Sequence, residues 1–163
     1  MKLPTAGLIT LKEDKLLLAY SNNKKAWYLP GGKIDRNETA VEAIIREIEE
    51  ELSIKLDSEK LSYYCHVTAP AYGEAIGIIM EQECFLYNLE KHNIEASHEI
   101  GAVKYFSYED YLKEPIQVCG VITVYKRLLK DNIIIKTKDI KNSNSPFSSI
   151  KDEPSHQKIV QIK

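Results

Sequence analysis

The stretch that decides the fold spans residues 29–54 and reads LPGGKIDRNETAVEAIIREIEEELSI. It sets a Pro-Gly-Gly turn just ahead of a segment with helical periodicity. That segment carries four glutamates almost consecutively, Glu47, Glu49, Glu50 and Glu51, although like charges one helical turn apart repel each other. Two interpretations are open from this pattern alone: a solvated acidic helix face, or a group of carboxylates that binds a cation.

The acidic segment has the pattern of an amphipathic helix that begins near Thr39. Thr39 and Glu42 match the pattern of a capping box, in which each side chain is expected to accept a hydrogen bond from the other residue's backbone N–H. An apolar stripe predicts the face that packs on the core: Val41, Ile44, Ile45, Ile48 and Leu52. Glu47, Glu50 and Glu51 lie at i, i+3 and i+4, so their carboxylates converge on a separate face. Mg²⁺ or Mn²⁺ is the ion that suits such an oxygen-rich face.

The bulk composition predicts one globular domain. The chain has 163 residues, of which 44% are hydrophobic and 28% charged, and a net charge of −2. These values allow a single core and give no global field that recruits nucleic acid or an anionic membrane. We expect no signal peptide and no transmembrane segment, because no apolar run is long enough. Three widely spaced cysteines, Cys65, Cys84 and Cys119, predict reduced core thiols in a cytoplasmic protein.

Strand and helix patterns alternate along the rest of the chain. Two apolar runs, residues 6–11 and 16–20, flank the polar KEDK and predict a hairpin. Helices are expected at residues 108–112 and from Pro115 to about Lys130. Further strands are expected at residues 61–68, 75–89 and 101–107, with one more candidate at 132–135. The pattern indicates an α/β domain over residues 1–135, built on a mixed sheet, followed by a polar, mobile tail over 136–163.

The central stretch resembles the Nudix box, usually written G-x5-E-x7-R-E-U-x-E-E-x-G-U, where U is a bulky aliphatic residue. The residues at those positions are Gly32, Glu38, Arg46, Glu47, Ile48, Glu50, Glu51, Ser53 and Ile54. Every defined position matches except the second glycine, where this chain has Ser53. A left-handed serine at a helix C-cap costs on the order of 1 kcal/mol and removes no ligand. Residues 6–30 also resemble the family's N-terminal hairpin and its Trp-x-Leu-Pro approach.

The resemblance implies a Nudix fold, an α/β/α sandwich around a mixed β-sheet. It also implies hydrolysis of a phosphoanhydride bond in a nucleoside diphosphate linked to another moiety, with Mg²⁺ or Mn²⁺ as the cofactor. Glu50, Glu51 and the Gly31 carbonyl resemble the family's metal ligands. Glu47 resembles the residue that serves as a further ligand or as the general base.

Other positions of the box resemble supporting residues. Arg46 corresponds to the residue that holds a glutamate in place by a charge-assisted hydrogen bond, and we count it with Glu47 as catalytic. Gly32 and Glu38 correspond to structural positions that tie the loop to the helix. An ordinary surface ion pair between Arg46 and Glu38 is the alternative.

Candidates outside the box are less well defined. Family members often use a further acidic residue as base or ligand, and the candidates here are Glu81, Glu83 and Glu99. Each has the alternative of being a plain surface carboxylate. The candidate substrate contacts are Trp27, Tyr28, Leu29 and Tyr72. Within the family a proline after the box indicates ADP-ribose-like substrates and a tyrosine indicates dinucleoside polyphosphates. Pro70 and Tyr72 are both present, so the substrate stays open.

Two functions from different classes stay open. The first is a metal-dependent hydrolase acting on a nucleoside triphosphate, ADP-ribose or a nucleotide sugar, or a dinucleoside polyphosphate. The second is a non-catalytic Nudix-fold module that binds or senses a nucleotide, and it is disfavoured because Glu47, Glu50 and Glu51 are all retained. We expect a small-molecule nucleotide as partner, no membrane and, for want of a basic groove, no nucleic acid. A homodimer is compatible with the sequence, which leaves the oligomeric state and the number of metal ions open.

Overall fold

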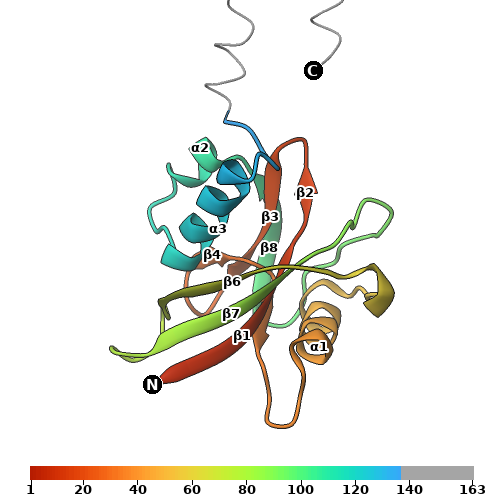
Figure 1. The fold of residues 1–163 in the computed structure, drawn as a ribbon, viewed down its shortest axis with the longest axis vertical. Helices are drawn as coiled ribbons and strands as arrows, with labels where there is room; N and C mark the ends of the chain where they lie inside the picture. The colour runs from red at the N-terminus through yellow and green to blue at the C-terminus, as the bar shows by residue number, and fades with distance from the viewer. Residues whose placement is uncertain (137–163) are drawn as a thin grey trace, which may run out of the picture.

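The computed structural model describes residues 1–136, which form two β-sheets with a long helix on either side (Figure 1). The strands are β1 (Lys2–Ile9), β2 (Leu11–Lys12), β3 (Lys15–Ser21), β4 (Ala26–Tyr28), β5 (Gly31–Lys33), β6 (Ser62–Pro70), β7 (Ile79–Leu86) and β8 (Ile100–Phe106). The helices are α1 (Ala40–Leu52), α2 (Tyr108–Tyr111) and α3 (Cys119–Lys130), with a 3₁₀ turn at Ser58–Lys60. The predicted α/β class is confirmed.

One sheet is mixed and the other antiparallel. The mixed sheet has the order β5-β1-β7-β6, in which only β1 and β7 run parallel. In the second sheet β3 is central and pairs antiparallel with β2, β4 and β8. The long β1–β7 pairing joins residues almost 80 positions apart, so it closes the domain rather than forming locally.

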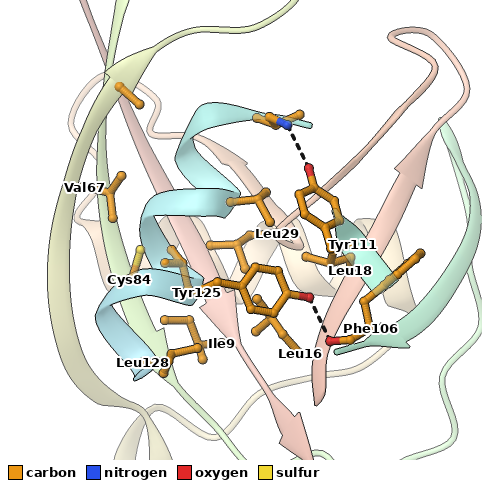
Figure 2. Packing of buried hydrophobic residues seen from close by; sticks show 14 of the residues in the cluster. Ile9, Leu16, Leu18, Leu29, Val67, Cys84, Phe106, Tyr111, Tyr125 and Leu128 are labelled. Atoms are coloured by element: carbon orange, nitrogen blue, oxygen red, sulfur yellow. Dashed lines mark hydrogen bonds between the residues drawn. The ribbon is translucent and has the colours of Figure 1, made fainter. Parts of the chain in front are cut away.

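Two hydrophobic clusters hold the layers together. The α1 cluster joins that helix to β1 and to residues after β7, with Ile44, Ile48 and Leu52 fully buried. The α3 cluster is rich in aromatic residues, and Figure 2 shows two of its tyrosines using their hydroxyls inside the core. Tyr125 donates to the Phe106 carbonyl at 2.8 Å, and the Tyr111 hydroxyl accepts from the Val118 amide at 2.8 Å. Burial is possible because each polar tip has a partner.

The α1 helix begins as its sequence predicts. The Thr39 hydroxyl accepts from the Glu42 amide at 3.1 Å, and the Glu42 carboxylate accepts from the Thr39 amide at 2.9 Å. Ala43, Ile44, Ile48 and Leu52 are buried, while Val41 and Ile45 are half-buried at the margin of the stripe. The capping box and the core face of α1 are therefore confirmed.

The C-terminus of α1 ends on Ser53 in the left-handed conformation, with φ 60° and ψ 35°. Residues 95–98 compensate for the missing glycine by bonding to the last turn of the helix. The Ser53 hydroxyl donates to the Glu95 carbonyl at 3.2 Å, and the Ser97 amide donates to the Glu51 carbonyl at 2.9 Å. The orphan carbonyls of the helix end are thus satisfied by a distant loop.

Several predicted elements differ in the structure. The first apolar run does not form the expected long hairpin, because β1 pairs with β7; the hairpin is the short β2–β3, turning at Glu13 and Asp14, which both have positive φ. The expected Pro-Gly-Gly turn continues as β5, because residues 31–33 pair with β1. The strand expected from residue 75 begins at Ile79, since Gly73 and Gly77 adopt positive φ and turn the chain first.

The C-terminal part of the domain also departs from expectation. α3 begins at Cys119 rather than at Pro115, because the Tyr111 hydroxyl holds the Val118 amide and the preceding residues form a loop. The candidate strand at 132–135 is absent from the described residues, where the Ile133 amide bonds back to the Leu128 carbonyl at 2.9 Å and the chain wraps the helix end.

The cysteines are free, as predicted, but only two are core residues. Cys65 and Cys84 are buried, whereas Cys119 is exposed at the start of α3. No helix within residues 1–136 is long and apolar enough to cross a bilayer. The tail predicted over 136–163 lies outside the described residues apart from Lys136.

Candidate active site

Two box glutamates are brought against β5. Glu51 is 6% exposed, and its Oε1 accepts a hydrogen bond from the Gly31 amide at 2.9 Å. The Glu47 carboxylate lies over Gly32, where an added Cβ would come within 2.5 Å of the carboxyl carbon. Only glycine leaves room for this contact, so the structural position given to Gly32 has a steric reason.

Gly31 offers a backbone oxygen in the same place. Leu8 donates to the Pro30 carbonyl at 2.8 Å and Ile34 donates to the Pro4 carbonyl at 3.0 Å, which makes Gly31 a member of a non-hydrogen-bonded pair with Gly7. The backbone groups of such a residue point away from the neighbouring strand, here from β1. The Gly31 amide, which is not bonded to β1, donates to the Glu51 carboxylate instead.

Arg46 links the loop, the helix and the carboxylates. Its guanidinium binds Glu38 in a bidentate manner, with Nε to Oε2 at 2.7 Å and a terminal nitrogen to Oε1 at 2.9 Å. The same side chain donates to the Glu47 carboxylate at 2.9 Å and to the Lys33 carbonyl at 3.0 Å. The Arg46 hydrogen bonds, helped by the Asp35 amide, lower the pKa of Glu38 to about 2.

The electrostatics of the cluster are those of a site short of positive charge. Burial, together with the neighbouring charges of Glu47, Glu99 and Glu50, raises the pKa of Glu51 to about 8 against the opposing effect of the Gly31 hydrogen bond. Burial also raises the pKa of Glu47, although Arg46 opposes the shift. Several carboxylates crowded in a buried site favour a bound cation, which would lower their pKa values and so restore their negative charge.

The donor set fits a hard divalent ion. The candidate ligands, Glu47, Glu50, Glu51 and the Gly31 carbonyl, are all oxygen donors, which Mg²⁺ and Mn²⁺ prefer. Within residues 1–136 no three acidic, histidine or cysteine side chains are already arranged to hold an ion. Arg46 accounts for part of this, because it binds Glu47 at 2.9 Å and lies 3.6 Å from the half-exposed Glu50.

A cavity of about 390 Å³ opens beside the carboxylates, between the two sheets. Glu47, Glu51 and Gly31 are among the residues that line it. Tyr28, Leu29 and Tyr72, three of the four candidate substrate contacts, line it as well. The Tyr28 hydroxyl donates to the Tyr72 carbonyl at 3.1 Å, with the ring centroids 6.2 Å apart. Trp27 does not line this cavity; its ring packs on Phe106 at 4.9 Å.

Glu99 is the one of the three acidic candidates outside the box that reaches the cavity. It lines the cavity wall, and its charge raises the pKa of both Glu47 and Glu51. Its position follows from its neighbours: residues 95–98 bond to the end of α1, and the Glu99 carbonyl accepts from the Asn22 amide at 2.9 Å. Hydrogen bonds therefore hold this loop both to the end of α1 and to Asn22, the residue that follows β3.

Glu81 and Glu83 lie elsewhere, on the strand pair β6–β7. Both bind His66, at 2.5 Å from Glu81 to Nε2 and 3.0 Å from Glu83 to Nδ1. Thr68 also donates to Glu81 at 2.9 Å. Neither glutamate lines the cavity, so their contacts are with this separate cluster.

Several cavity residues were not foreseen. Lys24 and Lys33 lie at the cavity with Glu74, whose carboxylate is 3.0 Å from the first ammonium and 3.7 Å from the second. Thr5 and Gln82 face each other in the β1–β7 register and also line the cavity. In the sequence, each of the two is a polar residue within an otherwise apolar strand. Periodicity alone does not distinguish such a residue from one on the protein surface.

Comparison with known proteins gives a consistent family. The model of the NUDIX domain matches residues 1–119. A search of curated proteins found no significant match. Among solved structures, a MutT NUDIX hydrolase from Burkholderia pseudomallei is 23% identical, with a TM-score of 0.62 over 77% of this chain and 95% of that one.

Two further structures have the same fold. An Ap4A hydrolase from C. elegans is 24% identical, with a TM-score of 0.60 over 80% of this chain and 97% of that one. A bifunctional NMN adenylyltransferase/ADP ribose pyrophosphatase from Francisella tularensis, in complex with AMP and a Mn ion, is 22% identical with a TM-score of 0.61. The match covers 80% of this chain but 42% of that one.

Proposed function

The chain belongs to the Nudix hydrolase family, and we propose that it hydrolyses a phosphoanhydride bond in a small nucleotide with the help of Mg²⁺ or Mn²⁺. The substrate class is a nucleoside diphosphate linked to a further phosphate, sugar or nucleotide. The observation that carries the proposal is the crowding of Glu47, Glu51 and Glu99 in the wall of a cavity of about 390 Å³.

The metal-binding residues of this proposal are Glu47, Glu50, Glu51 and the Gly31 carbonyl. A bound divalent ion supplies charge neutralisation at phosphate oxygens and lowers the pKa of a coordinated water. The Francisella structure, in which a Mn ion is present, supports a divalent ion in this fold. A further support from this chain is the raised pKa of the buried Glu51, whose carboxylate has no cationic partner within residues 1–136.

The protein's own residues have three tasks in the proposed reaction. Arg46 positions Glu47, because its guanidinium is held by Glu38 on one side and binds the Glu47 carboxylate on the other. Glu47 and Glu99 are the carboxylates placed to take a proton from an attacking water. We favour Glu99 over Glu81 and Glu83 as the acidic residue outside the box, because it lines the cavity.

The rest of the cavity supports a small-molecule substrate. Tyr28 and Tyr72 offer aromatic surfaces at its wall, and Lys24 and Lys33 offer positive charge for phosphate groups. Three free cysteines fit a reducing, cytoplasmic setting, which we include in the proposal.

The test is a hydrolysis screen of the full chain with Mg²⁺ or Mn²⁺. The substrates are nucleoside triphosphates, ADP-ribose, nucleotide sugars and dinucleoside polyphosphates. Glu51→Gln keeps the side-chain shape and removes a ligand charge, whereas Glu49→Gln removes an exposed charge from the same helix and serves as the control. We expect one substrate class to be cleaved, and Glu51→Gln to lose about a hundredfold in kcat or more.

Two results would contradict the proposal. Cleavage that survives Glu51→Gln unchanged would remove the carboxylate cluster from the mechanism. Nucleotide binding without cleavage, with either ion and every substrate class, would instead favour the sensor module.

A further inference from the structure

The floor of the cavity is built by facing residues of β1 and β7. These strands run parallel, and their register pairs Leu3 with Met80 and Thr5 with Gln82. All four residues line the cavity. The floor is therefore apolar at its outer pair and polar at the next pair inward, where both side chains are more than nine-tenths buried.

The hydroxyl of Thr5 makes no hydrogen bond within residues 1–136. It is 6% exposed, and its Oγ1 is the one buried side-chain polar atom within residues 1–136 that lacks a hydrogen-bond partner. Burying an unsatisfied hydroxyl destabilises a fold, and valine has the same shape without that cost. By contrast, the buried Thr10 hydroxyl donates to the Tyr87 carbonyl at 2.5 Å. Thr5 lines the cavity, so this unpartnered hydroxyl lies in the cavity wall.

Gln82 presents its amide to the same place. The amide packs over Gly7, where an added Cβ would lie 2.9 Å from both Cδ and Nε2. The Cys84 thiol donates to Oε1 at 3.7 Å, whereas Nε2 has no hydrogen-bond partner within residues 1–136 and, unlike the Thr5 hydroxyl, is not fully covered by the protein. Thr5 and Gln82 together offer an amide donor beside a hydroxyl that can donate or accept.

We propose that Thr5 and Gln82 determine specificity by hydrogen-bonding the Watson–Crick edge of a purine base in the substrate. This inference rests on the proposed function, because it takes the phosphate groups to lie at the carboxylate end of the same cavity. A purine edge places an acceptor beside a donor, N1 beside the 6-amino group or O6 beside N1–H. The Gln82 amide meets the acceptor and the Thr5 oxygen meets the donor.

The cavity suits a base for reasons beyond this pair. Leu3, Leu29 and Met80 provide an apolar surface, and Tyr28 provides an aromatic one, so the base is surrounded by apolar groups. Sites that hydrogen-bond a polar edge reject analogues that lack it, because buried groups of the protein are then left unpaired. A purine without its 6-substituent should therefore bind poorly.

The test measures binding rather than turnover. Calorimetric titration of the full-length protein with AMP, GMP and purine riboside 5′-monophosphate compares purine edges with and without a 6-substituent. We expect AMP or GMP to bind about tenfold more tightly than the unsubstituted purine, equivalent to about 1.4 kcal/mol. In Thr5→Val and in Gln82→Met this preference should disappear.

Thermal unfolding separates this role from a structural one. Thr5→Val should leave the Tm of the free protein equal to or above that of the wild type, since it removes an unsatisfied hydroxyl. Thr10→Val is the matched control: it breaks a satisfied buried hydrogen bond, so it should lower the Tm and leave the purine preference intact.

The outcomes distinguish the two proposals. Equal binding of all three monophosphates to the wild type, or a preference that survives Thr5→Val and Gln82→Met, would overturn the role of the pair even if hydrolysis is observed. A preference that depends on the pair, in a protein that cleaves nothing, would uphold the pair and remove the hydrolase.

Discussion

The helices α1 and α3 are of nearly equal length, 13 and 12 residues, and cover opposite sides of the sheets, yet they are built for different purposes (Figure 1). α3 buries apolar and aromatic side chains and has basic residues in its last turn, where they suit the helix dipole. α1 buries Glu51 and crowds further carboxylates beside it. This arrangement costs stability, and the capping box at Thr39 stabilises α1 against part of that cost.

The inward-facing residues of the two helices differ in what they contribute to the core. α3 could lose none of its inward residues without loosening the core, whereas the inward carboxylate of α1 contributes nothing to packing that a glutamine would not. A buried carboxylate breaks the ordinary rules of helix packing on α1 and is absent from α3, which is why the proposed function assigns the metal ligands to α1.

The largest expected effect is on the α3 side. Leu128 is fully buried, and Leu128→Ala should lower the free energy of unfolding by about 3 kcal/mol, because it leaves a cavity in the aromatic cluster. Urea denaturation measures this loss. The rate of hydrolysis per folded molecule should stay at the wild-type value, and a tenfold drop in that rate would mean that α3 takes part in the site.

The next largest expected effect is on the rate of the proposed hydrolysis. Arg46→Lys keeps the charge but loses the bidentate bond to Glu38, so Glu47 is held less firmly. We expect kcat to fall about tenfold with a stability change under about 1 kcal/mol. Arg127→Lys on α3, where Arg127 binds Asp131 at 2.9 Å, is the matched control and should leave kcat unchanged. Equal rates for all three proteins would remove Arg46 from the positioning role.

A smaller effect concerns the helix caps. Thr39→Ala removes the side-chain cap of α1 and should destabilise the protein by about 1 kcal/mol. Thr123→Ala, in the exposed middle of α3, loses only a bond to the Cys119 carbonyl and gains helix propensity. Chemical denaturation should show a clear loss for the first variant and none for the second; equal losses would contradict the assigned role of the cap.

The smallest effect lies outside both helices, at His66. Hydrogen bonds that the His66 ring donates to the Glu81 and Glu83 carboxylates raise the pKa of His66 above its ordinary 6.5. A raised folded-state pKa contributes stability that is fully present below pH 6.5 and is lost as the pH rises through the folded-state value. The Tm difference between wild type and His66→Gln should therefore shrink with rising pH. The double variant Glu81→Gln, Glu83→Gln should abolish this trend, and a trend that persists there would refute the assignment.

The parts of the fold that depend on local sequence were predicted well. The capping box and the apolar stripe predicted α1, whereas Glu50, which was expected beside Glu47 and Glu51, is exposed and does not line the cavity. Strand pairing was predicted less well, because the partner of β1 is β7, far away in the sequence. A hairpin was the natural expectation for two neighbouring apolar runs, and only the tertiary structure divides them between two sheets.

The candidate site shows the same difference between features set by local sequence and features set by long-range contacts. Glu99 could not be separated from Glu81 and Glu83 by sequence, because its position depends on hydrogen bonds from residues 95–98 to the end of α1. Thr5 and Gln82 are 77 positions apart, and only the parallel register brings them together. Residues that act through long-range pairing therefore need the structure.

The most direct test of the difference between the two helices is Mn²⁺ binding, measured by titration of the wild type, Glu51→Gln and Glu49→Gln. If the α1 carboxylates form a metal site, Glu49→Gln binds as the wild type does and Glu51→Gln binds about tenfold more weakly or worse. Equal affinity in all three proteins would show that the buried carboxylate of α1 does not hold the ion, and would contradict the account.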